Sequence, residues 1–495
     1  MKNIFTLLIV LAISMASCQK FDALEKDPNH PGTVPPSLIF TNVLYGTYYG
    51  PWSNVQKWNQ FWCSNYAYYG DQTYDWTNAR FNFTQLQNVK QMTLEAKRVG
   101  LPDINPYSAL GKFFNAYFFI DMSMRLGDVP LTDALKGLEN TQPKYDSQKA
   151  VFKQALVWLE EANNDLQQLI NKGDNSLTGD FMLGNSLSKW QKVVNAYKLR
   201  LLITLSKKES DSELNIKSQF SAVISNPTKY PLMASLDDNL KFTFNASTDK
   251  YPINPDEYGK TATRNNMSAT YLNTLVALRD PRTFIVADPA AAKLKSGLLP
   301  TDFEAYVGAS SGESLDDMSV KMLDGLYSPI SKNHYYGSYF GEPCIQIGYA
   351  EMCFNIAEAI NRGWVTGNAE TFYVKGIQAS WTFHGANVDT QWTAYYAQNS
   401  VKYNSDNQVA LTQILTQKYL AFFQNSGWEA YNNARRTGVP TFLTGVGTGN
   451  SQRIAKRWQY PSSERTTNSV NYHSALTSQF GADTDDINSE MWIYK

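Results

Sequence analysis

The sequence has 495 residues, of which 43% are hydrophobic and 18% are charged, and its formal net charge is −1. This apolar content excludes an intrinsically disordered chain, and the balanced, sparse charge excludes a basic nucleic-acid-binding arm and a coiled-coil rod. The length suggests two to four domains and also allows one large domain.

The chain begins with the pattern of a lipoprotein signal. Lys2 precedes an apolar run of 11 residues, Ile4 to Ser14, which is too short for a membrane-spanning helix of ~20 residues. Small residues then lead to Cys18 and resemble a bacterial lipobox, in which the Cys is acylated and becomes the first mature residue. We predict a signal peptide over residues 1–17 and lipidation of Cys18 by chains such as palmitate. The alternative is a secretory signal with a chance Cys.

A proline-rich segment follows the lipobox. Prolines at positions 28, 31, 35 and 36 interrupt residues 18–36, which predicts an extended lipidated tether that ends in a docking segment. No later apolar run approaches the length of a membrane span. We therefore expect a protein that is anchored to a membrane and not threaded through it.

Aromatic residues crowd the segment from Tyr45 to Phe83, which holds 14 of them. The earlier rings recur at helical steps and are expected in the core. The later stretch, residues 68–80, has Gly, Asp, Thr and Asn between its rings, which is typical of an exposed loop. Exposed rings among short polar groups suit sugar binding, because rings stack on C–H faces while polar groups take hydroxyls. The alternative is a loop that folds back to seal the core.

Helical periodicity dominates the rest of the chain, where apolar residues recur every three or four positions in several segments. These segments are 152–169, 190–205, 345–360 and 411–422. Residues 146–149 supply capping groups before the first of them, and Gly173 supplies a stop. Strand-like alternation is sparse, and residues 240–244 are the best example.

Long stretches rich in Gly, Pro, Asn, Ser and Tyr separate the helical segments. The main ones are 64–83, 226–267, 308–343 and 439–475. Loops of this length are usually functional or disordered. No clean 34-residue consensus marks a tetratricopeptide repeat, so the residues alone predict a mainly helical protein with long loops.

Three cysteines remain after Cys18, at positions 63, 344 and 353. An odd number does not complete a disulfide framework. Cys344 and Cys353 could pair in an exported protein, but their nine-residue spacing on an expected helix favours buried free thiols.

Motifs in a fixed order along the chain resemble those of the SusD/RagB family of Bacteroidetes outer-membrane lipoproteins. They are the lipobox at Cys18, Asp27–Leu38 (DPNHPGTVPPSL), Arg125–Pro130 (RLGDVP), Glu351–Gly363, Gly376–Ser380 (GIQAS), Gln417–Tyr419 (QKY), Gly427–Tyr431 (GWEAY), Arg435–Pro440 (RRTGVP) and Arg457–Asn471. The resemblance covers residues 15 to about 475. Two of these motifs also have a structural interpretation, because Gly127–Pro130 and Arg435–Gly438 have the residues that end helices.

The resemblance implies a mainly α fold, in which tetratricopeptide-like helix pairs carry a loop-rich half, with residues 37–495 as a single domain. It implies a lipid-anchored protein of the outer membrane that faces the cell surface. It also implies a SusC-like TonB-dependent transporter as partner, which such a lipoprotein caps as a hinged lid. Family members bind glycans or, in some branches, oligopeptides, and they are not catalysts.

Candidate ligand residues lie in two loops. The first loop offers Tyr69, Tyr74, Trp76, Asn78 and Arg80, and the second offers His334, Tyr335, Tyr336 and Tyr339. A third candidate segment, residues 251–266, includes Tyr258, Arg264 and Asn265. Loops align poorly within the family, so the resemblance carries over none of its contact residues.

Signals for catalysis and metal binding are weak. Neither His-Glu-x-x-His nor Gly-x-Ser-x-Gly occurs, and the four histidines lie far apart. Asp483, Asp485 and Asp486 could hold a structural Ca²⁺, and the alternative is a solvated acidic turn. We expect no catalytic residue and no cofactor.

The leading hypothesis is a surface lipoprotein that binds a glycan and delivers it to the transporter. The nearest alternative is the same lid role with oligopeptides, which would need backbone pairing and charged end clamps. A lipoprotein glycosidase or esterase and a structural repeat adaptor are alternatives of other classes. The near-zero net charge favours a neutral ligand over a polyanion and argues against nucleic acid.

Overall fold

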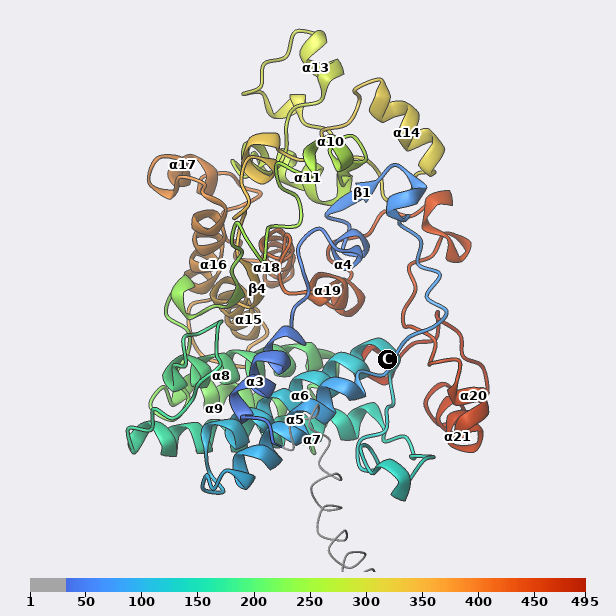
Figure 1. The fold of residues 1–495 in the computed structure, drawn as a ribbon. Helices are drawn as coiled ribbons and strands as arrows, with labels where there is room; N and C mark the ends of the chain where they lie inside the picture. The colour runs from blue at the N-terminus through green and yellow to red at the C-terminus, as the bar shows by residue number, and fades with distance from the viewer. Residues whose placement is uncertain (1–32) are drawn as a thin grey trace, which may run out of the picture.

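The chain is built mainly from α-helices, which form a lower layer and a left-hand group beside a loop-rich upper part (Figure 1). The computed structural model describes residues 33–495, and for Tyr69 the backbone alone. The predicted signal peptide, the lipidation site Cys18 and most of the tether fall within residues 1–32, outside the described residues. No helix within residues 33–495 combines the length and the apolar character needed to cross a membrane.

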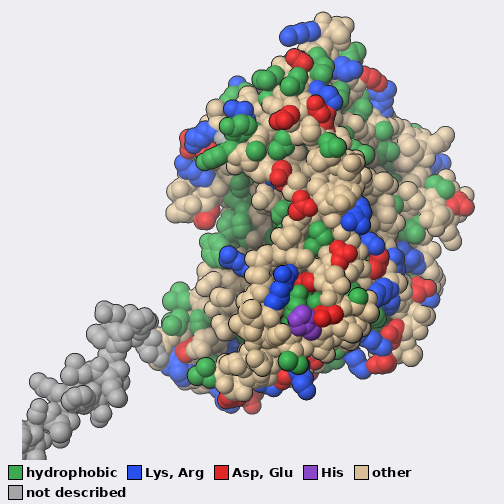
Figure 2. All heavy atoms as spheres, turned by 90° about the vertical axis from the view of Figure 1, so that its right-hand side faces the viewer, with side chains coloured by type: hydrophobic (Ala, Val, Ile, Leu, Met, Phe, Trp, Pro, Cys, Tyr) green, Lys and Arg blue, Asp and Glu red, His purple; other side chains and the backbone are tan. Residues whose placement is uncertain are grey.

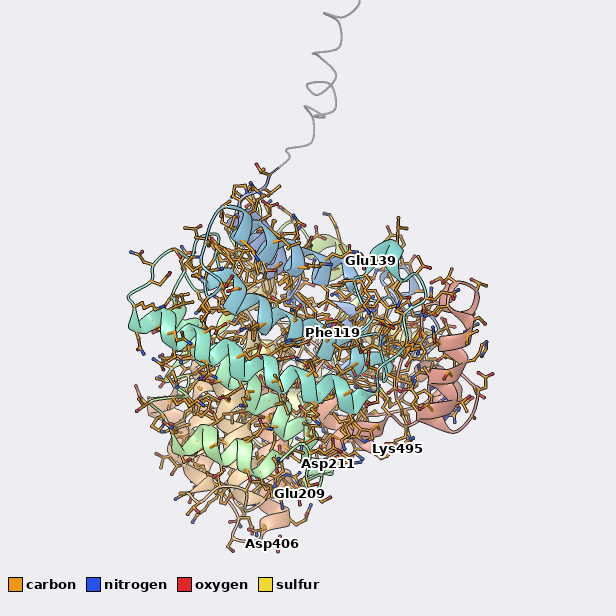
Figure 3. All side chains as sticks on the ribbon, turned by 90° about the horizontal axis from the view of Figure 1, so that it is seen from below. Phe119, Glu139, Glu209, Asp211, Asp406 and Lys495 are labelled. Carbon is orange, nitrogen blue, oxygen red and sulfur yellow. The ribbon has the colours of Figure 1, made fainter. Side chains whose placement is uncertain are left out.

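A layer of helices forms the lower part of the molecule. They are α3 (Pro36–Tyr45), α5 (Phe83–Arg98), α6 (Pro106–Leu126), α7 (Gln148–Asn171), α8 (Leu187–Thr204) and α9 (Ile216–Ser225). From α5 to α9 each helix packs against the next along the chain, and from below they lie side by side around Phe119 of α6 (Figure 3). Successive packed helices give the tetratricopeptide-like arrangement that the resemblance implied.

Helix α7 shows why these segments are helical. Its buried side chains recur every three or four residues from Phe152 to Leu169, which is one face of a helix. At its start the Ser147 hydroxyl accepts the Ala150 backbone N–H over 3.2 Å, which satisfies a donor of the first turn. After its end Gly173 has a φ of +68°, the left-handed conformation that stops a helix. The predicted helix, its cap and its stop are confirmed.

A second group of helices continues from the lower layer. They are α15 (Tyr349–Asn361), α16 (Ala369–His384), α17 (Val388–Tyr396), α18 (Asn407–Ala421) and α19 (Glu429–Thr437). Helix α15 packs against α8 and also against α16 and α18, so it joins the two groups. The helix ends predicted at two motifs are confirmed, because α6 stops before Gly127 (φ +94°) and α19 stops before Gly438 (φ +77°).

Shorter elements make up the loop-rich part. They are α4 (Asn54–Trp58), α10 (Tyr258–Thr261), α11 (Ala269–Ala277), α12 (Thr283–Val286), α13 (Ala291–Lys295), α14 (Leu315–Leu323), α20 (Glu464–Thr467), α21 (Ser469–Phe480), the π-helical turn η7 (Lys332–Tyr336), and the 3₁₀ turns η2 (Ala67–Tyr69), η3 (Gly137–Glu139), η4 (Leu205–Lys208), η5 (Leu236–Asp238), η6 (Phe303–Ala305), η8 (Val446–Thr448), η9 (Asn450–Gln452) and η10 (Trp492–Tyr494). The long loops expected from the sequence therefore contain single turns of helix and little regular structure.

Short antiparallel strand pairs link distant parts of the chain. Strand β1 (Trp62–Ser64) pairs with β3 (Asn265–Met267), and β2 (Leu240–Phe242) pairs with β4 (Cys344–Ile347). The strand predicted near residue 240 is confirmed. The helix predicted from residue 345 is wrong at its start, because β2 supplies a ladder partner there and α15 begins only after the extended Gly348.

The cysteines of the described part, at positions 63, 344 and 353, are free and buried. Cys344 lies on strand β4, whereas Cys353 lies on helix α15. The prediction of buried free thiols is confirmed, although the two residues do not share a helix.

A buried ion pair joins the lower layer to the second helix group. The Arg200 guanidinium of α8 donates to the Glu351 carboxylate of α15 over 2.6 Å. It also donates to the Gln346 backbone carbonyl of β4 over 2.8 Å. A single side chain thus fixes a helix and a strand on α8.

Several cations converge on Glu358 of α15, which is completely buried. Arg436 of α19 donates to its carboxylate over 2.8 Å, and Arg362 donates to it over 2.9 Å. Burial raises the pKa of Glu358, but these cations, Arg436 foremost, lower it more, so that it is about 2. The cluster holds α19 on α15, since loss of one partner would leave the other charge buried and uncompensated.

We expect Glu358→Gln to lower the free energy of unfolding by about 3 kcal/mol near neutral pH, because Arg436 loses its anion. The folded-state pKa lies below the ordinary value of 4.5, so the stabilisation is full above that value and is lost as pH falls toward 2. Urea unfolding followed across this pH range measures both effects. Stability should fall less steeply with acid in the variant than in the parent, and equal slopes would contradict the assignment. Glu139→Gln, at an exposed carboxylate, is the matched control.

Candidate functional site

The predicted loop over residues 68–80 folds back onto the core. Tyr74 and Trp76 are 1% and 2% exposed, so the expectation of exposed rings at these two positions is wrong. The Tyr74 hydroxyl donates to the Trp58 carbonyl over 2.7 Å, and its backbone N–H donates to the Thr448 carbonyl over 2.8 Å. The alternative interpretation, a loop that seals the core, holds for this part of the segment.

An aromatic cluster explains the burial of Trp76. Its ring stacks on Trp458 with centroids 4.8 Å apart and planes 8° apart. Trp58, Trp428 and Tyr431 meet it edge-on at centroid distances of 5.4, 5.5 and 5.1 Å. Such arrangements stabilise beyond the area that they bury. Trp76 is therefore part of the core, and its partners come largely from the C-terminal region of the chain.

The second predicted loop also turns its central rings inward. Tyr335 and Tyr336 lie in the π-helical turn η7 and are both buried, so the expectation of exposure is wrong for them as well. His334 and Tyr339 stay partly exposed. The loop therefore presents only its edges to solvent.

Glu342 fixes this loop from beneath. One oxygen of its carboxylate lies 2.8 Å from His334 Nε2 and 2.9 Å from Nδ1 of His384, the last residue of α16. The other oxygen accepts the Tyr335 hydroxyl over 3.3 Å. Burial raises the pKa of Glu342, but the two histidines lower it more, so that it is about 2. An ionised carboxylate thus ties the η7 loop to the helical part.

Segments that are far apart in the sequence meet at one surface above this loop. Strand β1 pairs with β3, so the residues that follow β1 lie beside those that precede β3. The Asn65 N–H donates to the Arg264 carbonyl over 2.9 Å, and the Arg264 guanidinium lies 4.3 Å from the centre of the Tyr66 ring. From α10, Tyr258 meets Tyr336 of η7 with ring centroids 5.4 Å apart.

We call this region the tyrosine surface, formed by Tyr66, Tyr68, Tyr258 and Tyr339 with the charged side chains between them. Tyr66, Tyr68 and Tyr258 are 46%, 83% and 39% exposed. The Tyr339 hydroxyl donates to the Asp256 carboxylate over 2.9 Å. The sequence led us to expect exposed rings beside hydrogen-bonding groups. The structure shows this arrangement, but Tyr66 and Tyr68 take part in place of Tyr74 and Trp76.

The three candidate segments of the sequence all contribute to the tyrosine surface. The third segment supplies Tyr258 and Arg264, whereas its Asn265 is buried in β3. Tyr66 was missed because it continues the helical spacing of the preceding rings, although the chain leaves β1 there and enters η2. The adjacent Gly70, with a φ of +84°, is the local signal of a turn.

The remaining predicted residues of the first loop lie elsewhere or are not described. Asn78 and Arg80 are exposed, but Asn78 Oδ1 accepts the Ser462 N–H over 3.1 Å, which places it beside the C-terminal segment. The side chain of Tyr69 is outside the described residues. Ligand contact by these residues stays a prediction.

The C-terminal carboxylates do not gather around a common point. Asp485 pairs with Arg457 and accepts the Tyr472 hydroxyl over 3.1 Å. Asp483 lies 2.6 Å from His473. In residues 33–495 no three His, Cys, Asp or Glu side chains are grouped as metal ligands. A structural calcium ion at this turn stays a prediction.

A groove of about 400 Å³ lies between α19 and the C-terminal segment. Two of its aromatic residues, Tyr431 and Tyr494, are only 2% and 4% exposed, and the Arg435 guanidinium lies 4.2 and 4.6 Å from their ring centres. Lys456 pairs with Glu490 at its rim. The tyrosine surface, with rings open to solvent, is the stronger candidate for ligand binding.

Comparison with known proteins gives a consistent result. A model of the SusD-like family, described as "Starch-binding associating with outer membrane", matches residues 28–461. Two SusD homologues of known structure from Bacteroides fragilis are 30% and 31% identical, with TM-scores of 0.84 and 0.81, and are matched over 93% and 94% of this chain and all of theirs. A chitin-binding SusD homologue from Flavobacterium johnsoniae shares the fold at 19% identity and a TM-score of 0.73, over 93% of this chain and 98% of its own. No curated protein matches the chain.

We expect Trp76→Ala to lower the free energy of unfolding by about 3–5 kcal/mol, because it leaves a cavity among packed aromatic rings. Urea denaturation followed by circular dichroism measures the change. Tyr68→Ala removes an exposed ring of the same loop region and should change stability by less than about 0.5 kcal/mol. A Trp76→Ala protein as stable as the parent would show that this ring is not part of the core.

Proposed function

The chain belongs to the SusD-like family of outer-membrane nutrient-binding proteins, which are not enzymes, and from this membership we propose that it binds a glycan for uptake. The family sets the general role, and the chemistry of the tyrosine surface supports the class of ligand. A chitin-binding relative with the same fold is consistent with a polysaccharide.

The observation that carries the glycan assignment is the exposure of Tyr66, Tyr68 and Tyr258 among polar groups. A tyrosine ring offers an apolar face for the C–H side of a sugar and a hydroxyl at its edge. Carboxylate, ammonium and guanidinium groups between the rings can take sugar hydroxyls. The rings lie on loops held by a rigid core, which is where binding residues are usually found.

We also propose that acyl chains on Cys18 anchor the protein in the outer membrane, facing the cell surface. The described chain begins just before α3 in the lower layer, whereas α10 and β1 lie in the upper part (Figure 1). A tether at one end of the molecule and a ligand surface toward the other suit a protein that collects material at the membrane. The partner would be a SusC-like TonB-dependent transporter, which receives the glycan from this lid.

Oligopeptides are the alternative ligand. A peptide site pairs with backbone groups and clamps charged ends, whereas stacked rings suit sugars. The tyrosine surface presents rings, and this favours the glycan.

We expect Tyr258→Ala to weaken binding of a recognised polysaccharide by about 1–3 kcal/mol, because an exposed stacking ring is lost. Affinity electrophoresis against starch, chitin oligosaccharides and other plant and microbial polysaccharides identifies the ligand, and calorimetry measures the loss. Tyr45→Ala is the control, since Tyr45 is 46% exposed, against 39% for Tyr258, but lies in the lower layer and packs against Phe181 and Phe242. Equal losses in both variants, or binding of oligopeptides alone, would contradict the proposal.

We expect Cys18→Ala to release the protein from the membrane fraction, because an unacylated chain has no stable lipid anchor and residues 33–495 contain no spanning helix. Cell fractionation with immunoblotting measures the distribution, and metabolic labelling with a palmitate analogue measures acylation. Cys63→Ala is the matched control and should stay in the membrane. Retention of the Cys18→Ala protein in the membrane would exclude the lipid anchor.

A further inference from the structure

Two of the segments that form the tyrosine surface carry more positive than negative charge, whereas the segment of Tyr66 and Tyr68 adds the carboxylate of Asp71. In residues 250–264 and 332–340 the cations are Lys250, Lys260, Arg264 and Lys332, and the carboxylates are Asp256 and Glu257. The whole chain, in contrast, has a formal net charge of −1, and both signs mix across the face drawn in Figure 2. These two segments therefore differ from the chain as a whole, in which the two signs nearly balance.

Both carboxylates are already engaged. Asp256 lies 3.0 Å from the Lys250 ammonium, and it also accepts the Tyr339 hydroxyl. Glu257 lies 2.9 Å from the Lys260 ammonium. Two of the cations are thus balanced by neighbours, and no carboxylate of these segments is left for the other two.

Arg264 and Lys332 lie against rings. The Arg264 guanidinium lies 4.3 Å from the centre of the Tyr66 ring, and the Lys332 ammonium lies 4.5 Å from that of Tyr258. Among the residues that the structure describes, neither side chain forms an ion pair with a carboxylate. A cation–π contact positions a cation without neutralising it, because the ring carries no net charge.

Asp288 is the acidic group beside the η7 turn, and it interacts electrostatically with the Lys332 ammonium without forming a close ion pair. The Asp288 carboxylate accepts the backbone N–H of Lys332 over 3.0 Å. Burial raises the pKa of Asp288. This carboxylate supports the turn and compensates Lys332 only in part, and the exposed Lys332 side chain lies over the Tyr258 ring.

We infer that the ligand of the tyrosine surface is an acidic glycan, whose sugars carry carboxylate or sulfate groups. This inference rests on the proposed glycan-binding function. Tyr66 and Tyr258 each have beside them a cation that forms no ion pair, so an acidic sugar can stack and form a charge-assisted hydrogen bond at one place. The net charge of the chain is a poor guide, since charges farther away than about 10 Å are screened at physiological ionic strength. The local pattern therefore replaces our expectation of a neutral ligand.

The test compares acidic and neutral polysaccharides on the mature protein. Affinity electrophoresis and calorimetry would use polygalacturonate, alginate and chondroitin sulfate against starch, xylan and chitin oligosaccharides. We expect an acidic glycan to bind about tenfold or more tightly than each neutral one, and to lose affinity as sodium chloride is raised. Chondroitin sulfate carries both carboxylate and sulfate, so a preference for it over polygalacturonate and alginate would indicate sulfate recognition, and equal or weaker binding would indicate carboxylate recognition.

Charge-removing variants connect the preference to these two cations. Arg264→Gln and Lys332→Gln should each weaken the acidic glycan by about five- to tenfold, with unchanged melting temperature. Lys293→Gln removes the same charge from α13 and should leave binding unchanged. Tight binding of a neutral glycan that neither variant weakens would overturn the acidic ligand and leave the glycan-binding function intact. Failure to bind any glycan, acidic or neutral, would overturn both.

Discussion

The loop-rich part of the molecule depends on side chains that satisfy its backbone, because long loops provide no regular ladder of backbone hydrogen bonds. The Tyr419 hydroxyl of α18 lies 3.1 and 3.0 Å from the carbonyls of Asn59 and Gln60. The Asn59 amide donates to the Gly427 carbonyl over 2.7 Å. Arg200 likewise reaches a carbonyl of β4. Contacts of this kind hold segments from both ends of the chain against the helices. The surface loops are therefore fixed in position by the helical part.

Local periodicity was enough to predict the helices but not the strands. Residues 152–169 repeat an apolar face through five turns, so α7 needs no information from elsewhere in the chain. Strand β4 was predicted as helix because Ile345 fits the spacing of α15. Its extended form comes from Leu240–Phe242, a partner about a hundred residues earlier, and such pairing leaves little trace in a local pattern.

The same limit explains which site residues could be predicted. The composition of the loops indicated where exposed rings would gather, and three such loops do meet at the tyrosine surface. It did not show which rings face inward, because Trp76 is buried by Trp428 and Trp458, and Tyr335 is bonded to Glu342. Burial of a loop ring is decided by partners from other segments, and these become visible only in the folded structure.

Fold and ligand chemistry are therefore specified by different residues of the same loops. Inward-facing rings such as Trp76 and Tyr335 belong to the packed core. Tyr258 and Lys332 are exposed and Arg264 is partly exposed, so changes at these positions are expected to cost the fold little. Proteins that share this fold can then differ in the charge of their exposed loops and bind different glycans. Similarity in fold at 30% identity accordingly determines the family, while the ligand has to be read from the exposed side chains and the charges held beside them.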